Sequence, residues 1–241
     1  MGGPAVVGAG LLAEIARHGS VLAVVAHPDD ESFGLGAILA ALAAAGAEVG
    51  VLCMTHGEAS TLGAAFELAS VRRRELTAAA EHLGVKHVAL HGFADGNLAE
   101  VAEEALDDVV EAALGDAVTL VVFEPSGVTG HPDHQAATMS AHRVAARSGL
   151  AVVEWGVATD VATRLNNEFA TTFVALAGDD VIGVQVDRVV QLAAIACHES
   201  QARDNPVLAR RLELEGSLEW IRWVRPRDRR SIKASLTPTH R

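Results

Sequence analysis

The sequence has few of the features that mark several large classes of protein. Its 241 residues include only two cysteines and no tyrosine, and aromatic residues make up 4% of the chain. Two cysteines are too few for a disulfide framework, so we expect buried thiols in a reducing cytoplasm. Basic residues are also scarce, because 19 Lys and Arg face 31 Asp and Glu, for a net charge of −12. Such a surface repels a phosphate backbone over most of its area, so we expect no nucleic acid as a partner.

Long apolar runs and targeting features are missing as well. The longest weakly polar stretch, residues 34–55, is interrupted by Gly46 and Glu48 and is rich in Ala and Gly. It predicts a helix, a turn and a strand instead of a membrane span. The first 20 residues have no basic flank and carry Glu14, so we expect no targeting signal and no membrane insertion.

One basic concentration stands out near the end of this acidic chain. It consists of Arg222, Arg225, Arg227, Arg229, Arg230 and Lys233. We interpret it as a solvated tail. Contact with an anion, or with a second copy of the chain in a homo-oligomer, is the competing interpretation.

The first 150 residues alternate between two kinds of segment. Apolar, strand-like segments at 21–26, 49–54, 87–90 and 118–123 are separated by Ala- and Leu-rich stretches with helical spacing. The clearest helix spans 66–84 and ends at a glycine. This alternation predicts an α/β fold, a Rossmann-like and mostly parallel sheet flanked by helices.

The pattern changes after about residue 150. Segments 150–158, 169–176 and 181–187 are strand-like with only short turns between them, which predicts antiparallel strands. A helix over 188–201 and a last strand over 218–226 follow. We therefore expect a single domain over 1–241, with a core at about 20–150 and a smaller C-terminal subregion at about 151–241.

Two clusters of charged and polar side chains follow strands of this predicted sheet. "HPDDES" comes directly after the first strand and "GHPDH" comes after the fourth, at the edge where open α/β sheets bind ligands. His27 and Asp30 are three residues apart, and so are His131 and His134. Catalytic zinc takes three such ligands plus a water, so His27, Asp30 and one histidine of the second cluster predict an open metal site.

Simpler interpretations exist for each cluster alone. Acids and Ser32 at a helix start are typical of capping, and Pro132 with Asp133 suits a surface turn. Capping accounts for one acid but not for His-Pro followed by three acids in a row. The pairing of both clusters at strand ends therefore favours a metal site.

The two clusters also carry a resemblance to a known family. "AHPDDE" followed by "GHPDH" resembles the LmbE-like, or PIG-L, family of zinc-dependent N-deacetylases, which hydrolyse acetamides on glucosamine-type sugars. The likeness extends through "THGEAS" at 55–60, Arg72 and Glu75, "FADGNL" at 93–98 and "CHESQ" at 197–201. The implied substrate is a small acetylated sugar conjugate.

The resemblance implies that His27, Asp30 and His134 hold one Zn²⁺ per chain, with Asp29 as general base. It also implies that His131 aids the oxyanion or the leaving amine. The residue chemistry agrees, because Asp29 is adjacent to a ligand yet free to point elsewhere and take a proton. We expect His131 to be cationic and oriented by Asp133, which otherwise serves as a turn-capping residue. An N/O ligand set also accepts iron or cobalt.

The resemblance further implies a set of substrate-binding residues. These are Glu58, Arg72 and Asp95 near the sugar hydroxyls, and His198 at the pocket wall. The competing interpretations are an exposed helix charge for Arg72, a turn residue for Asp95, and a histidine facing the last helical carbonyls for His198.

The chain also departs from the family in one respect. Some sugar-conjugate deacetylases of the family carry a tyrosine two residues before the second motif, where this chain has Thr129. A tyrosine-assisted oxyanion hole is therefore excluded. The aromatic candidates for stacking on a sugar or a larger aglycone are Trp155, Phe169 and Phe173.

Two alternatives stay open. The same site can serve an amidase or deacetylase of a natural-product or non-sugar amide. A nucleotide-binding Rossmann protein is more remote, because "GLGAIL" has Leu39 where the third glycine is needed and begins eight residues past the strand.

Overall fold

A single eight-stranded sheet forms the centre of the molecule. The structure is a computed structural model, and it describes residues 5–8, 10–61 and 67–226. The strands are β1 Ala5–Val7, β2 Ser20–Val25, β3 Val49–Thr55, β4 His87–Phe93, β5 Ala117–Phe123, β6 Ala151–Gly156, β7 Val181–Gln185 and β8 Leu218–Val224. Their order is β1-β7-β8-β6-β5-β2-β3-β4, and only β8 runs antiparallel to its neighbours. The predicted fold class, a mostly parallel sheet flanked by helices, is confirmed.

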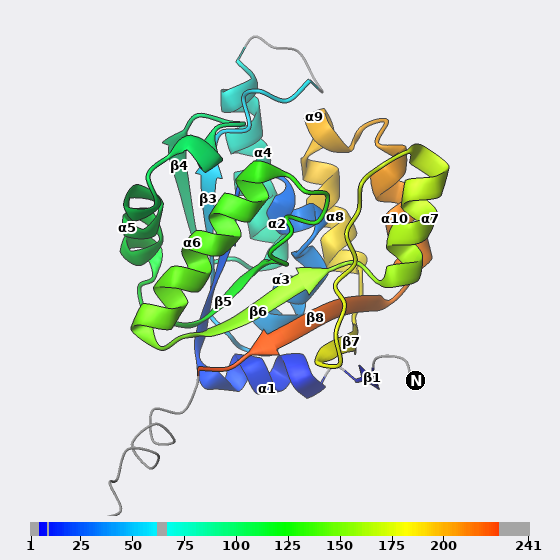
Figure 1. Cartoon of the computed structure of the whole chain (residues 1–241), viewed down its shortest axis with the longest axis horizontal. Helices are drawn as coiled ribbons and strands as arrows, with labels where there is room; N and C mark the ends of the chain where they lie inside the picture. Colours follow the sequence, from blue (N-terminus) through cyan, green and yellow to red (C-terminus); the bar gives the residue numbers. More distant parts are fainter. Residues whose placement is uncertain (1–4, 9, 62–66, 227–241) are drawn as a thin grey trace, which may run out of the picture.

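Helices cover both faces of this sheet (Figure 1). They are α1 Gly10–His18, α2 Asp30–Phe33, α3 Gly36–Ala44, α4 Leu68–Leu83, the 3₁₀ turn η1 Leu98–Glu100, α5 Glu103–Ala113, α6 Pro132–Ser148, α7 Thr159–Phe169, α8 Val189–Cys197, α9 Glu199–Ala202 and α10 Pro206–Glu215. In Figure 1, α6 (green) lies in front of the sheet and α3 (blue) lies behind it. None of the helices in the described ranges is long and apolar enough to cross a membrane.

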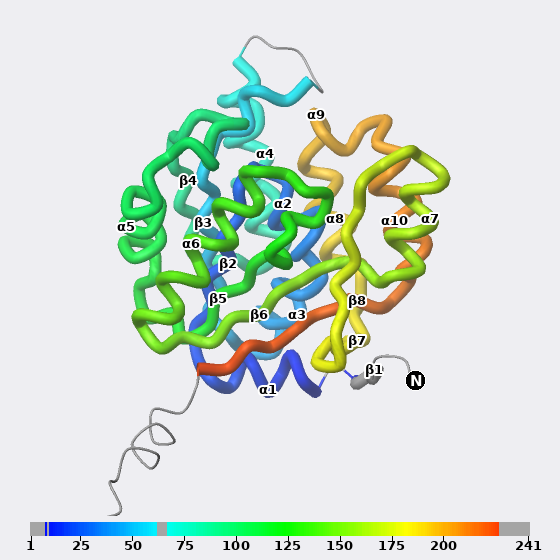
Figure 2. The backbone as a smooth tube through the Cα atoms, in the orientation of Figure 1, coloured from blue at the N-terminus to red at the C-terminus, as the bar shows by residue number. Residues whose placement is uncertain are grey.

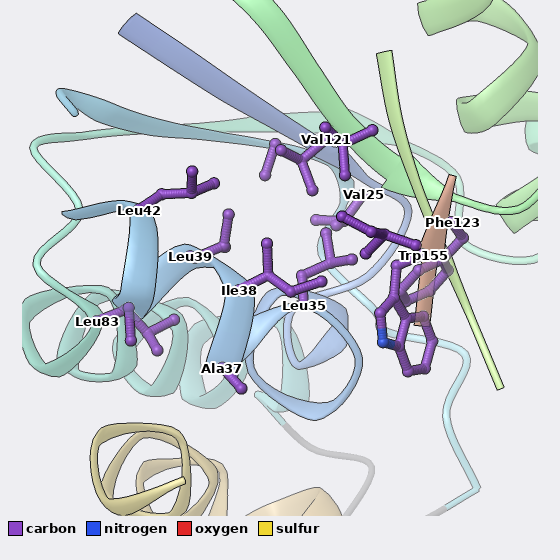
Figure 3. Packing of buried hydrophobic residues seen from close by; sticks show 14 of the residues in the cluster. Val25, Leu35, Ala37, Ile38, Leu39, Leu42, Leu83, Val121, Phe123 and Trp155 are labelled. Atoms are coloured by element: carbon purple, nitrogen blue, oxygen red, sulfur yellow. The ribbon is translucent and has the colours of Figure 1, made fainter. Parts of the chain in front are cut away.

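The apolar run of β2 is explained by burial on both faces. Val21, Ala23 and Val25 point into one core cluster, which includes side chains of α1, α3, α4 and α8. Leu22 and Val24 point into a second cluster under α5 and α6. Because successive side chains alternate between faces, a strand covered on both faces has no polar positions. Figure 3 shows the first cluster, in which leucine and isoleucine side chains of α3 point toward the sheet.

The predicted helix over 66–84 is confirmed as α4 over the described residues. It runs from Leu68 to Leu83, and Gly84 ends it with a φ of 77°, a conformation that suits glycine. The predicted helix, turn and strand within 34–55 correspond to α3 and β3.

The C-terminal part differs from the prediction. The strand predicted over 169–176 is absent, apart from one bridge between Val157 and Ala175. The side chain of Asn166 explains this, because its Oδ1 accepts from Phe173 N at 2.7 Å and its Nδ2 donates to Phe173 O at 2.9 Å. These bonds occupy backbone groups that a strand ladder would use.

Two further corrections concern the same part. Only β8 is antiparallel, whereas β6 is parallel to β5 and β7 is parallel to β1. The helix α7 was not predicted, although Val161, Leu165 and Phe169 recur at a spacing of four residues.

The strand order places a crevice next to β2. From β2 the sheet continues through β3 and β4 on one side and through β5 and β6 on the other. Open sheets bind ligands where the strand order reverses in this way, outside the carboxyl ends of the strands. Figure 2 shows how the chain passes from β2 into α2 and how α6 lies beside β2.

Candidate active site

The first cluster forms a tight loop between β2 and α2. The Asp30 Oδ2 atom accepts a hydrogen bond from His27 N at 2.8 Å, which ties the loop to the start of α2. Asp29 has a φ of 137°, in the region that only glycine enters readily, and its side chain makes no cap hydrogen bond. The capping interpretation of the Asp29 side chain is therefore wrong, because its carboxylate pairs with Arg72 and not with the helix N-terminus.

The second cluster opens α6 beside β5. His131 is the N-cap residue, and His134 lies in the first turn of the helix. Gly127, with a φ of 77°, permits this approach, because a Cβ there would lie 2.7 Å from His131 O and 3.2 Å from His134 Cβ. The loop after β5 thus brings His134 back toward the end of β2.

Three side chains from these two loops converge on one point. The His27 Nδ1 and His134 Nε2 atoms are 3.2 Å apart. The two carboxylate oxygens of Asp30 lie 3.2 Å from His134 Nε2 and 3.5 Å from His27 Nδ1. Donor atoms of a tetrahedral zinc site, about 2.0–2.2 Å from the ion, are separated by about 3.3–3.6 Å. These contacts have lengths of this order, but each imidazole meets a different oxygen of Asp30. Donor atoms of two other groups, His27 with His131 and His134 and His27 with Asp95 and Asp133, also lie within 4.8 Å of one another.

The outer nitrogens of both imidazoles face hydrogen-bond acceptors. His27 Nε2 lies 3.0 Å from Asp95 Oδ1 and 3.3 Å from Asp133 Oδ2. His134 Nδ1 lies 3.2 Å from the carbonyl of Gly127. If each outer nitrogen carries the proton, the inner nitrogens direct lone pairs at each other and at Asp30. A cation between them removes this repulsion, and outer acceptors of this kind are typical of metal-binding histidines.

The electrostatics of the loops also favour positive charge at this point. Burial alone would lower the pKa of His27, but hydrogen bonds to its carboxylate neighbours outweigh burial and raise it to about 12. Burial is likewise outweighed at Asp30, where the two histidines hold the pKa well below its ordinary value. Metal binding would replace the protons that these imidazoles otherwise retain.

Asp29 lies next to the three converging side chains but faces Arg72. Its Oδ2 atom is 2.9 Å from Arg72 Nη2, and its side chain is 14% exposed. Burial raises the pKa of Asp29 to about 6, although the charge of Arg72 acts in the opposite direction. A carboxylate whose pKa is nearer to neutrality is better suited to accept a proton from water.

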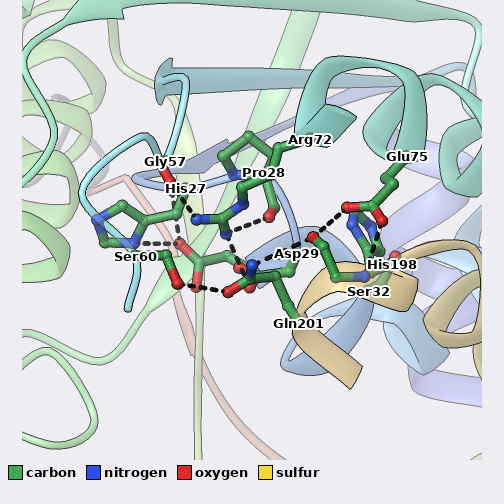
Figure 4. A network of polar contacts seen from close by, with 12 residues as sticks. His27, Pro28, Asp29, Ser32, Gly57, Ser60, Arg72, Glu75, His198 and Gln201 are labelled. Carbon is green, nitrogen blue, oxygen red and sulfur yellow. Dashed lines mark hydrogen bonds and ion pairs between the residues drawn. The ribbon is translucent and has the colours of Figure 1, made fainter. Parts of the chain in front are cut away.

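Arg72 is buried and structurally engaged, and its role at the sugar hydroxyls stays a prediction. Its side chain is 3% exposed, so it is not the exposed helix charge of the competing interpretation. Besides the Asp29 ion pair it donates to the carbonyls of Pro28 at 2.5 Å and Gly57 at 2.7 Å (Figure 4). These bonds show that Arg72 holds the loop that carries Asp29, while one side of it still lines the pocket described below.

His131 and Asp133 need a second correction. The carboxylate of Asp133 does not orient His131, because it accepts from Gly96 N at 2.7 Å and Leu98 N at 3.0 Å and faces His27. Instead, His131 Nδ1 accepts from the backbone N of Asp133, which leaves Nε2 as the protonated nitrogen of a neutral ring. Burial, followed by the nearby His134 and His27, lowers the pKa of His131, so a cationic His131 is not supported.

The other predicted substrate-binding residues, Asp95, Glu58 and His198, lie at different depths relative to the pocket. Asp95 lines the pocket and faces His27, and its Oδ2 accepts from Ala59 N at 2.8 Å. Glu58 is exposed and accepts from Asp95 N at 3.1 Å, so it orders the Asp95 loop and is absent from the pocket lining. His198 is fully buried and lies 2.7 Å from Glu31 Oε1, so the prediction of His198 at the pocket wall is wrong.

A polar pocket of about 520 Å³ opens over the converging side chains. Besides Gln201 and the predicted site residues, its lining includes Phe33, Ala59, Ser60, Thr61, Gly96 and Asn205. Ser60 Oγ donates to Gln201 Oε1 at 2.7 Å, which joins the loop after β3 to α9. Gln201, in the "CHESQ" segment, was expected at the pocket and does line it. No periodicity indicated Asn205, which is an isolated polar residue that the chain path brings to the site.

The remote nucleotide-binding interpretation is not supported by the glycines near β2. A Cβ on Gly34 would lie 2.4 Å from Phe123 Cε1, and one on Gly36 would lie 3.0 Å from Gln191 Cγ. Both glycines therefore serve close packing of side chains and are not a phosphate-binding loop.

Comparison with known proteins agrees with this geometry. The model of the PIG-L family, described as GlcNAc-PI de-N-acetylase, matches residues 22–145. A 1D-myo-inositol 2-acetamido-2-deoxy-alpha-D-glucopyranoside deacetylase of Mycolicibacterium gilvum is 31% identical over 219 residues, which are 75% of this chain and 76% of that protein. The enzyme of the same name from Rhodococcus opacus is 34% identical over 152 residues, 52% of this chain and 51% of that protein. For this and several other curated relatives, the match spans only about half of their length.

Solved structures share the fold. A teicoplanin-pathway deacetylase superimposes with a TM-score of 0.65 at 20% identity, over 87% of this chain and 99% of that one. An N,N'-diacetylchitobiose deacetylase from Pyrococcus horikoshii gives 0.60 at 22% identity, over 95% and 94%. The match of the family model to half of the chain, together with the relative from M. gilvum, shows that this chain belongs to the PIG-L, or LmbE-like, family.

Proposed function

We propose that this chain is a metal-dependent amide hydrolase that removes the acetyl group from an N-acetylglucosaminyl conjugate. The observation that carries the proposal is the convergence of His27, Asp30 and His134, with donor atoms 3.2–3.5 Å apart beside the buried carboxylate of Asp29. We also propose that residues 1–241 act as one domain, since strands from both halves join one sheet.

The metal is the first part of the proposal. His27, Asp30 and His134 would hold one Zn²⁺ per chain, and iron or cobalt would suit the same N/O donors. When bound, such an ion lowers the pKa of a bound water to about 7 and polarises an amide carbonyl. Asp95 and Asp133 then accept a hydrogen bond from His27 Nε2–H, which leaves Nδ1 unprotonated and facing the site.

Proton transfer is the second part. Asp29 accepts a proton from the attacking water and delivers it to the departing amine nitrogen. Arg72 keeps this carboxylate in place through the Asp29 ion pair and the Pro28 carbonyl. The Nε2–H of His131 donates a hydrogen bond to the oxygen of the amide carbonyl and keeps its proton, which supplements the stabilisation of developing negative charge in a site without tyrosine.

The substrate class is the third part. The pocket is lined by hydroxyl and amide side chains, Ser60, Thr61, Gln201 and Asn205, which suit the hydroxyls of a sugar. The relatives named above act on acetamido sugars, which supports the same class here. A natural-product or non-sugar amide is the alternative substrate for the same residues.

Compartment and assembly belong to the same proposal. Cys53 and Cys197 are both free, which supports a reducing cytoplasm. Val189 and Leu192 on α8 are 70% and 50% exposed, which supports contact with a second copy. Analytical ultracentrifugation that finds only monomer at micromolar concentration would remove the homo-oligomer from the proposal.

Metal analysis combined with an assay of acetate release tests the function. The zinc-reconstituted chain should hold about one metal ion and release acetate from N-acetylglucosamine glycosides. We expect His27→Ala, Asp30→Ala and His134→Ala each to lose the ion and the activity, whereas His82→Ala, on the exposed side of α4, retains both. Full metal occupancy in all three variants contradicts the ligand set. Turnover of non-sugar acetamides alone contradicts the sugar assignment and leaves the hydrolase assignment intact.

A further inference from the structure

A second, apolar cavity adjoins the polar pocket. It has a volume of about 190 Å³ and shares Asp30, Phe33, His134 and Asn205 with the polar pocket. Most of its remaining lining is apolar: Phe123, Val128, Trp155, Phe173, Val207 and Leu208. We call this cavity the apolar chamber. It meets the polar pocket at two of the residues that would hold the metal.

The walls of the apolar chamber are tightly packed. The rings of Phe123 and Trp155 lie 5.3 Å apart at the end of β5 and β6 (Figure 3). Gly34 packs directly on them, because a Cβ at that position would lie 3.0 Å from the Trp155 ring. Such walls present a preformed surface to a ligand, which needs little rearrangement to bind there.

The lining contains one arginine, and the partners of its guanidinium lie within the protein. The Arg211 guanidinium lies 5.2 Å from the centre of the Trp155 ring. Its Nη1 donates to Glu215 Oε2 at 2.6 Å, and its Nη2 donates to the carbonyl of Phe33. Arg211 therefore closes the chamber wall and offers no free charge to an anionic ligand.

An amide substrate has two groups on opposite sides of its carbonyl. The nitrogen carries the sugar, which suits the polar pocket, and the carbonyl carbon carries the acyl chain. With the carbonyl at Asp30 and His134, where the two cavities meet, the acyl chain extends into the apolar chamber. We propose that this chain hydrolyses N-acyl sugars whose acyl group is longer than acetyl, with the acyl chain in the apolar chamber. This inference rests on the proposed hydrolase function.

The volume of the chamber sets the expected chain length. An acetyl methyl group fills only a small part of 190 Å³, since even a water molecule takes about 30 Å³. About five or six carbon atoms fit on the same scale, which corresponds to an acyl group of about six carbons. Each buried methylene adds about fourfold to transition-state binding when it leaves water. Water supplies OH to the acyl carbon and a proton to the nitrogen, so the products are a short fatty acid and the free amine.

The kinetic test compares acyl lengths on one sugar. The zinc-loaded protein is assayed with the methyl glycosides of N-acetyl-, N-butanoyl- and N-hexanoylglucosamine. We expect kcat/KM for the hexanoyl compound to exceed that for the acetyl compound by at least about tenfold. The hexyl glycoside of N-acetylglucosamine is the control that places the same apolar chain on the sugar side.

Variants locate the effect in the chamber. Val207→Trp fills the chamber from the first turn of α10, so the ratio of hexanoyl to acetyl kcat/KM should fall at least about tenfold. Leu212→Trp, at a half-buried position on the same helix outside the lining, should leave the ratio unchanged. Calorimetry gives a readout without turnover: hexanoate should bind at least about tenfold tighter than acetate to the wild type but not to Val207→Trp.

The outcomes separate the inference from the function on which it rests. Hydrolysis of the acetyl compound with no gain for longer acyl chains overturns the apolar chamber as an acyl site and leaves the deacetylase proposal intact. An increase in kcat/KM for the hexyl glycoside alone also overturns the assignment of the apolar chamber to the acyl group, because the apolar chain then enters from the sugar side. If no N-acyl sugar is hydrolysed, both proposals fail.

Discussion

Two of the buried charge clusters among the described residues differ in their balance. Between α8, α10 and β8, two arginines, Arg188 and Arg211, face two carboxyl groups, Glu215 and Glu219, and burial raises the pKa of Glu215 to about 8. In the candidate active site, four aspartates surround two histidines and one arginine: Asp29, Asp30, Asp95, Asp133, His27, His134 and Arg72. Only the second cluster has a deficit of permanent positive charge.

The difference shows what a buried charge cluster can and cannot indicate. Balanced ion pairs, such as Arg188 with Glu219, compensate each other and need no ligand. In the active site the inner nitrogens of His27 and His134 face each other across 3.2 Å, and only a cation or protons relieve that contact. Burial and charge alone are therefore weak signals of function, whereas unbalanced donors and acceptors that converge are a stronger one.

The largest expected effect is a loss of turnover when Asp29, in the candidate active-site cluster, is replaced. We expect Asp29→Asn to keep the metal and the fold while kcat falls between about a hundredfold and ten-thousandfold, because the proton acceptor is lost. Asp116→Asn is the matched control, since it lies exposed at the opposite edge of the sheet before β5. Equal loss of metal and activity in Asp29→Asn would instead make Asp29 a ligand.

The next effect is on stability, and it tests the balanced cluster. Arg188→Met leaves Glu219, whose side chain is fully buried, without its ion pair, so the free energy of unfolding should fall by about 3 kcal/mol. Metal content should not change. Adding Glu219→Gln should recover part of the loss, because the uncompensated charge is gone.

Urea denaturation measures these changes in the free energy of unfolding. The control is Arg203→Met, which removes an ion pair whose side chains are 68% and 67% exposed and should leave stability unchanged. If the Arg188→Met protein is as stable as the wild type but lacks metal, the assignment of stability to the balanced cluster and of metal binding to the candidate active site is contradicted.

The smallest effect concerns Asp107, which joins α5 to α6. Burial opposes its ionisation, but hydrogen bonds from Arg143, Arg147 and Ser140 outweigh burial and lower the pKa of Asp107 to about 2. A lowered folded-state pKa stabilises the fold above the unfolded value of about 3.9, and this contribution disappears as the pH falls toward 2.

We expect Asp107→Asn to lower the free energy of unfolding by about 1–2 kcal/mol at pH 7, a reduced figure because its arginine partners reach solvent. The difference from wild type should shrink as the pH is lowered from 4 toward 2. Asp108→Asn, the exposed neighbour on the same helix, should not alter either result. A difference that grows on acidification would contradict the assignment.

Particular residues show how far the sequence reached and where it failed. His27 and Asp30 were predicted from the first motif and His134 from the family resemblance. The structure brings these three together because both motifs follow parallel neighbouring strands. His198 was misplaced, since a sequence does not show that its ring turns inward to Glu31. Asp133 was assigned to His131, its neighbour along the chain, whereas it faces His27, 106 residues away.

The sequence by itself determined the alternation of apolar strands and helices, the positions of the two polar clusters, and the imidazole and carboxylate groups that they carry. Periodicity and residue type are local properties, and they survive in any fold that buries the same faces. Only the tertiary structure decided which acceptor orients each histidine, that Arg72 holds Asp29, and that an apolar chamber lies behind Asp30 and His134. Each of these depends on distances of a few ångströms between segments far apart in the chain, and such distances are set by packing of the whole core.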